Sequence, residues 1–127
     1  MAVVAATRTE TKQARHIERW VGTSAANTEI TLSTSATAPA TLRRLLYVVV
    51  KYSAAPTQTG VTVTLNSGAG AAYDTLLTTG TSNAQSTFYI PGSEVLLMSD
   101  DVIDVVGPAA GGAITGAVSI YTEIISN

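Results

Sequence analysis

Apolar and polar residues alternate along short segments of this chain, and turn-forming residues separate these segments. The clearest case is GVTVTLNS at residues 60–67, where Val61, Val63 and Leu65 share one face and the residues between them are polar. A period of two is typical of a strand that is buried on one side. Similar segments occur at residues 15–22, 28–35, 41–53, 72–80, 86–99, 100–107 and 114–125. This regular spacing of short segments predicts an all-β sandwich or barrel.

The number of segments and the lack of a helical pattern together restrict the possible fold classes. No stretch of about twelve residues has the apolar spacing of an amphipathic helix, which argues against an α/β fold. We therefore expect an antiparallel β-sandwich of about eight strands, jelly-roll-like, with an immunoglobulin-like sandwich as the alternative. A chain of 127 residues is the size of one domain. We expect an extended N-terminal arm over residues 1–14 and a single β-sandwich domain over residues 15–127.

The segment TLRRLLYVVVKYS at residues 41–53 is the strongest predicted strand. Its middle is apolar on both faces, which is expected of a strand covered on both sides. Arg43 and Arg44 lie near one end of the strand and Lys51 near the other. This pattern indicates a central strand whose charged side chains reach water at its tips.

Positive charge is confined to the first part of the chain. All seven Lys and Arg residues lie within residues 1–51, whereas residues 52–127 hold six of the nine acidic residues. Any acidic residue of the second part that pairs with a Lys or Arg of this chain must therefore reach back to the first part. Opposite charge in the two parts indicates a molecule with poles, which would steer contacts with copies of itself or with another protein.

The residue types leave little room for catalysis. There is no cysteine, and His16 is the only histidine, so no cofactor and no enzymatic activity are expected. Neither a Gly-x-Ser-x-Gly motif nor a phosphate-binding Gly-x-x-x-x-Gly-Lys motif occurs. The cluster of Asp100, Asp101 and Asp104 lacks the full spacing of a calcium loop, so we predict no metal site. An acidic patch between subunits is the alternative for these three residues.

The same residue types indicate whether the chain binds a membrane, nucleic acid or carbohydrate. The stretch MAVVAA is too short to span a membrane and lacks the order of a secretory signal, so no membrane contact is expected. Glu10 and Glu18 lie among the basic residues of the N-terminal part, and with a net charge of −2 we also expect no nucleic-acid binding. A carbohydrate-binding β-sandwich module remains open, with Trp20 as the candidate aromatic contact.

Residues 41–125 resemble the small β-sandwich virion proteins of tailed bacteriophages, of the head-decoration or cement type. The stretches that carry the resemblance are TLRRLLYVVVKYS, GVTVTLNSGAG, YIPGSEVLLMSDDVIDVVG and AITGAVSIYTEII. The resemblance implies a homo-oligomer, commonly a trimer, seated on the major capsid protein through an N-terminal arm. It implies no catalytic residues.

These inferences lead to one functional hypothesis. We expect a non-enzymatic virion protein, made in the host cytoplasm and bound to the capsid exterior, that bridges and stabilises neighbouring major capsid proteins. A tail, neck or fibre-base subunit is the alternative within the virion. The residues expected at the partner interface are Arg8, Lys12, Arg15, Arg19 and Trp20, with Trp20 as the anchor because buried aromatic side chains dominate interface energies.

Overall fold

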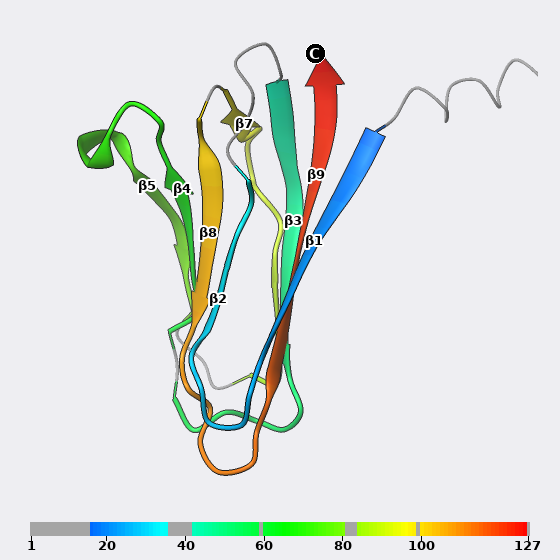
Figure 1. Ribbon diagram of the computed structural model, residues 1–127, viewed down its shortest axis with the longest axis vertical. Helices are drawn as coiled ribbons and strands as arrows, with labels where there is room; N and C mark the ends of the chain where they lie inside the picture. Colours follow the sequence, from blue (N-terminus) through cyan, green and yellow to red (C-terminus); the bar gives the residue numbers. More distant parts are fainter. Residues whose placement is uncertain (1–15, 36–41, 59, 81–83, 99, 127) are drawn as a thin grey trace, which may run out of the picture.

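The alternating segments form strands in a computed structural model, which describes residues 16–35, 42–58, 60–80, 84–98 and 100–126. The predicted arm at residues 1–14 lies outside the described residues. Within the described part, the strands form two antiparallel sheets that face each other (Figure 1). The elements are β1 (His16–Ser24), β2 (Ile30–Ser33), β3 (Leu42–Tyr52), β4 (Thr62–Asn66), the 3₁₀ helix η1 (Ala71–Tyr73), β5 (Thr75–Thr79), β6 (Ser86–Tyr89), β7 (Leu96–Leu97), β8 (Val102–Gly107) and β9 (Gly116–Ser126).

The strand order confirms the predicted jelly-roll-like sandwich. Sheet I has the order β1-β9-β3-β6, with β7 also paired to β3, and sheet II has the order β2-β8-β4-β5. Both β6 and β7 pair with β3 on the side away from β9, so they form one strand interrupted around Pro91 and Gly92. Counted this way, eight strands pair first with last, second with seventh, third with sixth and fourth with fifth. This is the pairing of one long hairpin folded over into two sheets, the arrangement of a jelly roll.

Strand β3 is the central strand of sheet I, as predicted. It pairs with β9 along one edge and with β6 and β7 along the other. A register shift between Leu45 and Tyr47 marks a β-bulge, after which Val48 and Val50 point into the core and are 1% exposed. Bulges insert one extra residue and bend the strand. The bulge therefore sets which β3 side chains face outward beyond it, namely Tyr47, Val49 and Lys51.

The core lies between the two sheets and is built from alternate residues of each strand. In β4 and just before it, Val61 and Val63 are buried and Leu65 packs against them, as the alternation predicts. Tyr52 closes one end of the core, where its hydroxyl donates to the Pro108 carbonyl at 3.2 Å. The other buried apolar residues are Ile30, Leu45, Val48, Val50, Leu97, Ile103, Val105, Ala110, Val118 and Ile120.

The described Lys and Arg residues all belong to sheet I. Arg19 lies in β1, and Arg43, Arg44 and Lys51 lie in β3. The segments of sheet II contain no Lys or Arg in the described ranges. The fold thus keeps the basic strands on one layer, although Glu18, Glu94 and Glu123 accompany them. Among the described residues, no helix is long and apolar enough to cross a membrane.

Candidate functional site

The outer surface of sheet I carries the most distinctive set of exposed side chains in the described structure. Because side chains alternate along a strand, β1, β9, β3 and β6 each turn every second residue away from the core. Several of these outward residues are large and apolar, and they are between 43% and 72% exposed. They are Ile17 and Val21 from β1, Phe88 from β6, Ile90 just after β6 and Ile125 from β9. Exposed apolar side chains that gather on one surface often mark an interaction site.

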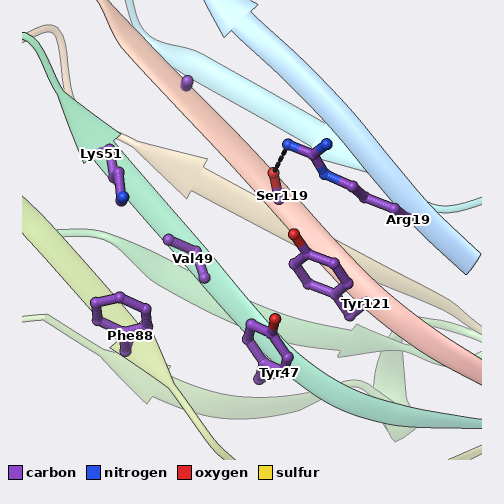
Figure 2. A pocket seen from close by; sticks show the side chains of 8 residues that line it. Arg19, Tyr47, Val49, Lys51, Phe88, Ser119 and Tyr121 are labelled. Atoms are coloured by element: carbon purple, nitrogen blue, oxygen red, sulfur yellow. Dashed lines mark hydrogen bonds between the residues drawn. The ribbon is translucent and has the colours of Figure 1, made fainter. Parts of the chain in front are cut away.

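A shallow hollow of about 260 Å³ lies in the middle of this surface. Figure 2 shows Val49 between Phe88 on one side and Tyr121 on the other, with Lys51 and Tyr47 further along β3 in opposite directions. The lining residues come from four strands that are distant in the sequence. They are Arg19, Tyr47, Val49, Lys51, Phe88, Ala117, Ser119 and Tyr121.

Two tyrosines form a rigid wall of the hollow. The rings of Tyr47 and Tyr121 stack with their centroids 4.4 Å apart and an interplanar angle of 19°. Partial burial raises the pKa of Tyr47 above its ordinary value, and the nearby Tyr121 raises it further. The Tyr47 phenol therefore stays neutral at physiological pH and can donate or accept hydrogen bonds.

Arg19 extends across the hollow from β1. Its guanidinium carbon lies 5.9 Å from the centre of the Tyr121 ring, and Nη2 donates to Ser119 Oγ at 3.3 Å (Figure 2). Among the described residues, neither Arg19 nor Lys51 has a carboxylate within ion-pair distance. The hollow is therefore apolar at its centre and positively charged at its margin.

The lining of the hollow combines aromatic, apolar, hydroxyl and cationic side chains. None of the eight lining residues carries a carboxylate or an imidazole, the groups that most often transfer protons near neutral pH. His16 is exposed at the start of β1, opposite Ile124. Within the described ranges, no three His, Asp or Glu residues are grouped so as to hold a metal ion.

The remaining cations of sheet I are held by carboxylates. Arg43 donates from Nε and Nη2 to the two carboxylate oxygens of Glu18 at 2.8 and 3.2 Å. Arg44 donates to Glu94 at 2.9 Å and to Glu123 at 2.5 Å, and the hydrogen bond to Glu123 is the main cause of its raised pKa. Acidic residues of the second part of the chain thus reach back to β3, as the charge distribution predicted.

The predicted interface residues are placed differently from one another. Arg8, Lys12 and Arg15 lie outside the described residues, whereas Arg19 lines the hollow. Trp20 points to the opposite side of β1, where it packs against the core and its indole nitrogen donates to Thr122 Oγ1 at 2.9 Å. A contact between Trp20 and a partner stays a prediction.

The three predicted acidic residues lie in β8 and in the turn before it. Asp104 accepts hydrogen bonds from Ser33 Oγ at 2.5 Å and from Asn66 Nδ2 at 2.9 Å on the surface of sheet II. Asp101 accepts from the backbone nitrogens of Gly68 and Met98 at 2.8 and 2.9 Å. Asp100 is exposed in the same turn with a positive φ of 66°. Their role between subunits stays a prediction.

The sequence interpretation missed the hollow itself. Alternation along β3 puts Tyr47, Val49 and Lys51 on one face, and alternation along β9 does the same for Ser119 and Tyr121. The period-two pattern therefore predicts, within each strand, which of these residues share a face. It could not show that β9 lies beside β3 or that Phe88 faces Val49, because strand pairing depends on the register between distant segments.

Comparisons with known proteins give only distant structural likenesses. No protein-family model and no curated protein matches the chain. A galactose complex of the family 32 carbohydrate-binding module from C. perfringens NanJ is 10% identical with a TM-score of 0.48, covering 81% of this chain and 93% of that one. A chitosan-binding module from a Paenibacillus chitosanase/glucanase is 11% identical with a TM-score of 0.48, covering 81% and 74%. The capsid structure of Helicobacter pylori bacteriophage KHP30 is 11% identical with a TM-score of 0.40, covering 88% and 94%. Structural similarity at these TM-scores and sequence identities does not indicate what the chain binds.

Proposed function

We propose that the chain is a non-catalytic structural subunit of a virion, of the head-decoration kind, that docks onto neighbouring protein subunits through the outer surface of sheet I. The observation that carries the proposal is the set of exposed apolar side chains around the hollow, bordered by Arg19 and Lys51. We call Ile17, Arg19, Val21, Lys51, Phe88 and Ile90 the cationic face. The virion setting comes from the sequence resemblance of residues 41–125.

The extent of the cationic face favours a protein partner. Its apolar side chains run from β1 at one edge of sheet I to β6 at the other. Protein interfaces have this build, with apolar and aromatic side chains at the centre and charged ones at the rim. A partner that covers four strands removes these apolar groups from water, which is favourable at roughly 25 cal/mol for each Å² buried.

Co-sedimentation with phage shells that lack the protein tests this proposal. Phe88→Glu replaces an apolar side chain beside the hollow, on the edge strand β6, with a negative charge, and we expect binding to fall at least about tenfold. Thr31→Glu is the matched control, since Thr31 is an exposed strand residue on the outer surface of sheet II. Equal binding by the wild-type chain and the Phe88→Glu variant would show that this surface does not dock.

Carbohydrate binding is the second candidate, and the hollow itself is the observation that favours it. The exposed ring of Phe88 can face the apolar side of a sugar, while Arg19, Lys51 and Ser119 can bind hydroxyl groups. Tyr47 and Tyr121, however, turn their rings toward each other, so fewer ring faces remain for a sugar. A glycan array separates the two functions. Reproducible binding that disappears with Phe88→Ser would favour the sugar-binding function over protein docking.

A further inference from the structure

A second exposed surface has the opposite charge. Exposed apolar side chains also occur where the β4–β5 connection meets the turn before β8, and they include Tyr73, Leu76 and Met98, which are 58–68% exposed. Asp74 and Asp100 are exposed beside them in the sequence. We call these five residues the acidic tip.

The acidic tip is a built part of the fold. Asp101 ties its two loops together, since its carboxylate accepts from Gly68 N in one loop and from Met98 N in the other. Asp74 accepts from Ser67 N at 2.9 Å and so fixes the start of its own loop. The described segments of these loops contain no Lys or Arg, so their charge is uniformly negative.

The cationic face and the acidic tip complement each other. One combines exposed apolar residues with Arg19 and Lys51, and the other combines exposed apolar residues with Asp74 and Asp100. Interfaces between proteins match positive with negative surface, which speeds association and sets the register. Each surface therefore offers the opposite charge and the exposed apolar side chains that would complement the other.

The two surfaces lie in different parts of the molecule, with the acidic tip at the β4–β5 end and the β7–β8 turn. In Figure 1 the β4–β5 end of sheet II projects to the left, whereas β3, β9 and β1 of sheet I lie on the right. One molecule cannot bring its own two surfaces together. Two molecules can, if the acidic tip of one meets the cationic face of the next.

From this arrangement we infer that the partner of the cationic face is the acidic tip of a second copy of this chain. The inference rests on the proposed function and names its partner. A contact between two different surfaces is heterologous, and it produces a closed ring when the rotation between subunits closes and a filament when it does not. The trimer implied by the sequence resemblance is one such ring.

Charge-swapped variants test the inference through sedimentation of the full chain at increasing concentration. The face variant carries Arg19→Glu and Lys51→Glu, and the tip variant carries Asp74→Lys and Asp100→Lys. Each variant alone brings like charges together, so we expect its self-association to be at least about tenfold weaker than that of the wild type. An equimolar mixture of the two restores opposite charges at each contact between unlike variants and should associate again. Glu29→Lys, a reversal at an exposed residue between β1 and β2, is the control.

Each outcome separates the inference from its alternatives. Weak association of both variants alone and its recovery in the mixture support the head-to-tail contact. A tip variant that self-associates as tightly as the wild type, while the face variant does not, would show that the acidic tip takes no part in the contact and would overturn the inference. A wild-type chain that stays monomeric at high concentration would also overturn it. The proposed function would survive that result if Phe88→Glu still reduced binding to shells.

Discussion

Gly107 is the position where a single methyl group should disturb the sandwich most. It ends β8, pairs with Ile30 of β2 and lies next to the hydroxyl of Tyr52. A Cβ atom added there would lie 2.5 Å from Tyr52 Oη and 2.6 Å from Ile30 Cγ2. Carbon atoms in ordinary contact are about 3.5–4.0 Å apart, so the Gly107→Ala substitution requires its neighbours to move by roughly 1 Å.

Neither neighbour can move freely. Ile30 is 1% exposed and Tyr52 is 4% exposed, so the core encloses both side chains. Overpacking of this kind costs about 1–3 kcal/mol, and a Tyr52 ring that shifts also weakens the hydrogen bond to Pro108, worth about 1 kcal/mol. Replacement of glycine by alanine returns about 0.4–1 kcal/mol by restricting the unfolded chain. The net loss in the free energy of unfolding should be roughly 1–4 kcal/mol.

Urea unfolding followed by the fluorescence of Trp20, the single tryptophan, measures this loss. The midpoint should fall while the slope with urea stays constant, as expected when only stability changes. Gly92→Ala is the matched control, because nothing lies within 4 Å of a Cβ at that position. If Gly107→Ala and Gly92→Ala unfold at the same urea concentration, the packing of Tyr52 against the end of β8 is wrong.

Two further predictions concern the charged and titratable groups. Glu18→Gln should lower the free energy of unfolding in urea by about 3 kcal/mol, because the Arg43 side chain is only 14% exposed and loses its carboxylate partner. Glu94→Gln should cost less than about 1 kcal/mol, because the side chains of Arg44 and Glu94 are 38% and 51% exposed. Equal losses for the two variants would contradict this difference. Burial raises the pKa of Tyr52, so the folded chain keeps the phenol proton to higher pH than the unfolded chain does. The stability that the neutral Tyr52 phenol contributes should therefore be complete below about pH 10 and be lost as the pH rises through the pKa of the folded chain. A Tyr52→Phe chain whose stability falls equally in that pH range would contradict this assignment.

Local alternation was enough to predict which segments form strands and which of their faces is buried. Val61, Val63 and Leu65 lie on the inner face as expected, and β3 is central because its middle is apolar on both sides. A period of two identifies the inner face of a strand without knowledge of its neighbours. The count of about eight strands then led to the correct two-layer arrangement.

The candidate site was harder to predict because it depends on contacts between distant strands. Arg19 was predicted at an interface and does line the hollow, but Phe88, Tyr47 and Tyr121 meet it only through the register of β6, β3 and β9. Glu123 shows the same limit. Its place in the alternation assigns it to the polar face of β9, yet it is 7% exposed because Arg44 pairs with it there.

The most direct test of the central claim is the chemical accessibility of the hollow in the assembled state. The chain has no cysteine, so Ala117→Cys places a single thiol in the hollow and Thr31→Cys places one on the outer surface of sheet II. Both positions are exposed in the single chain and should react with a maleimide at similar rates. In assembled particles, the account predicts that the Ala117→Cys thiol becomes protected while the Thr31→Cys thiol stays reactive. Equal labelling of the two thiols in those particles would show that the outer surface of sheet I is not an interface.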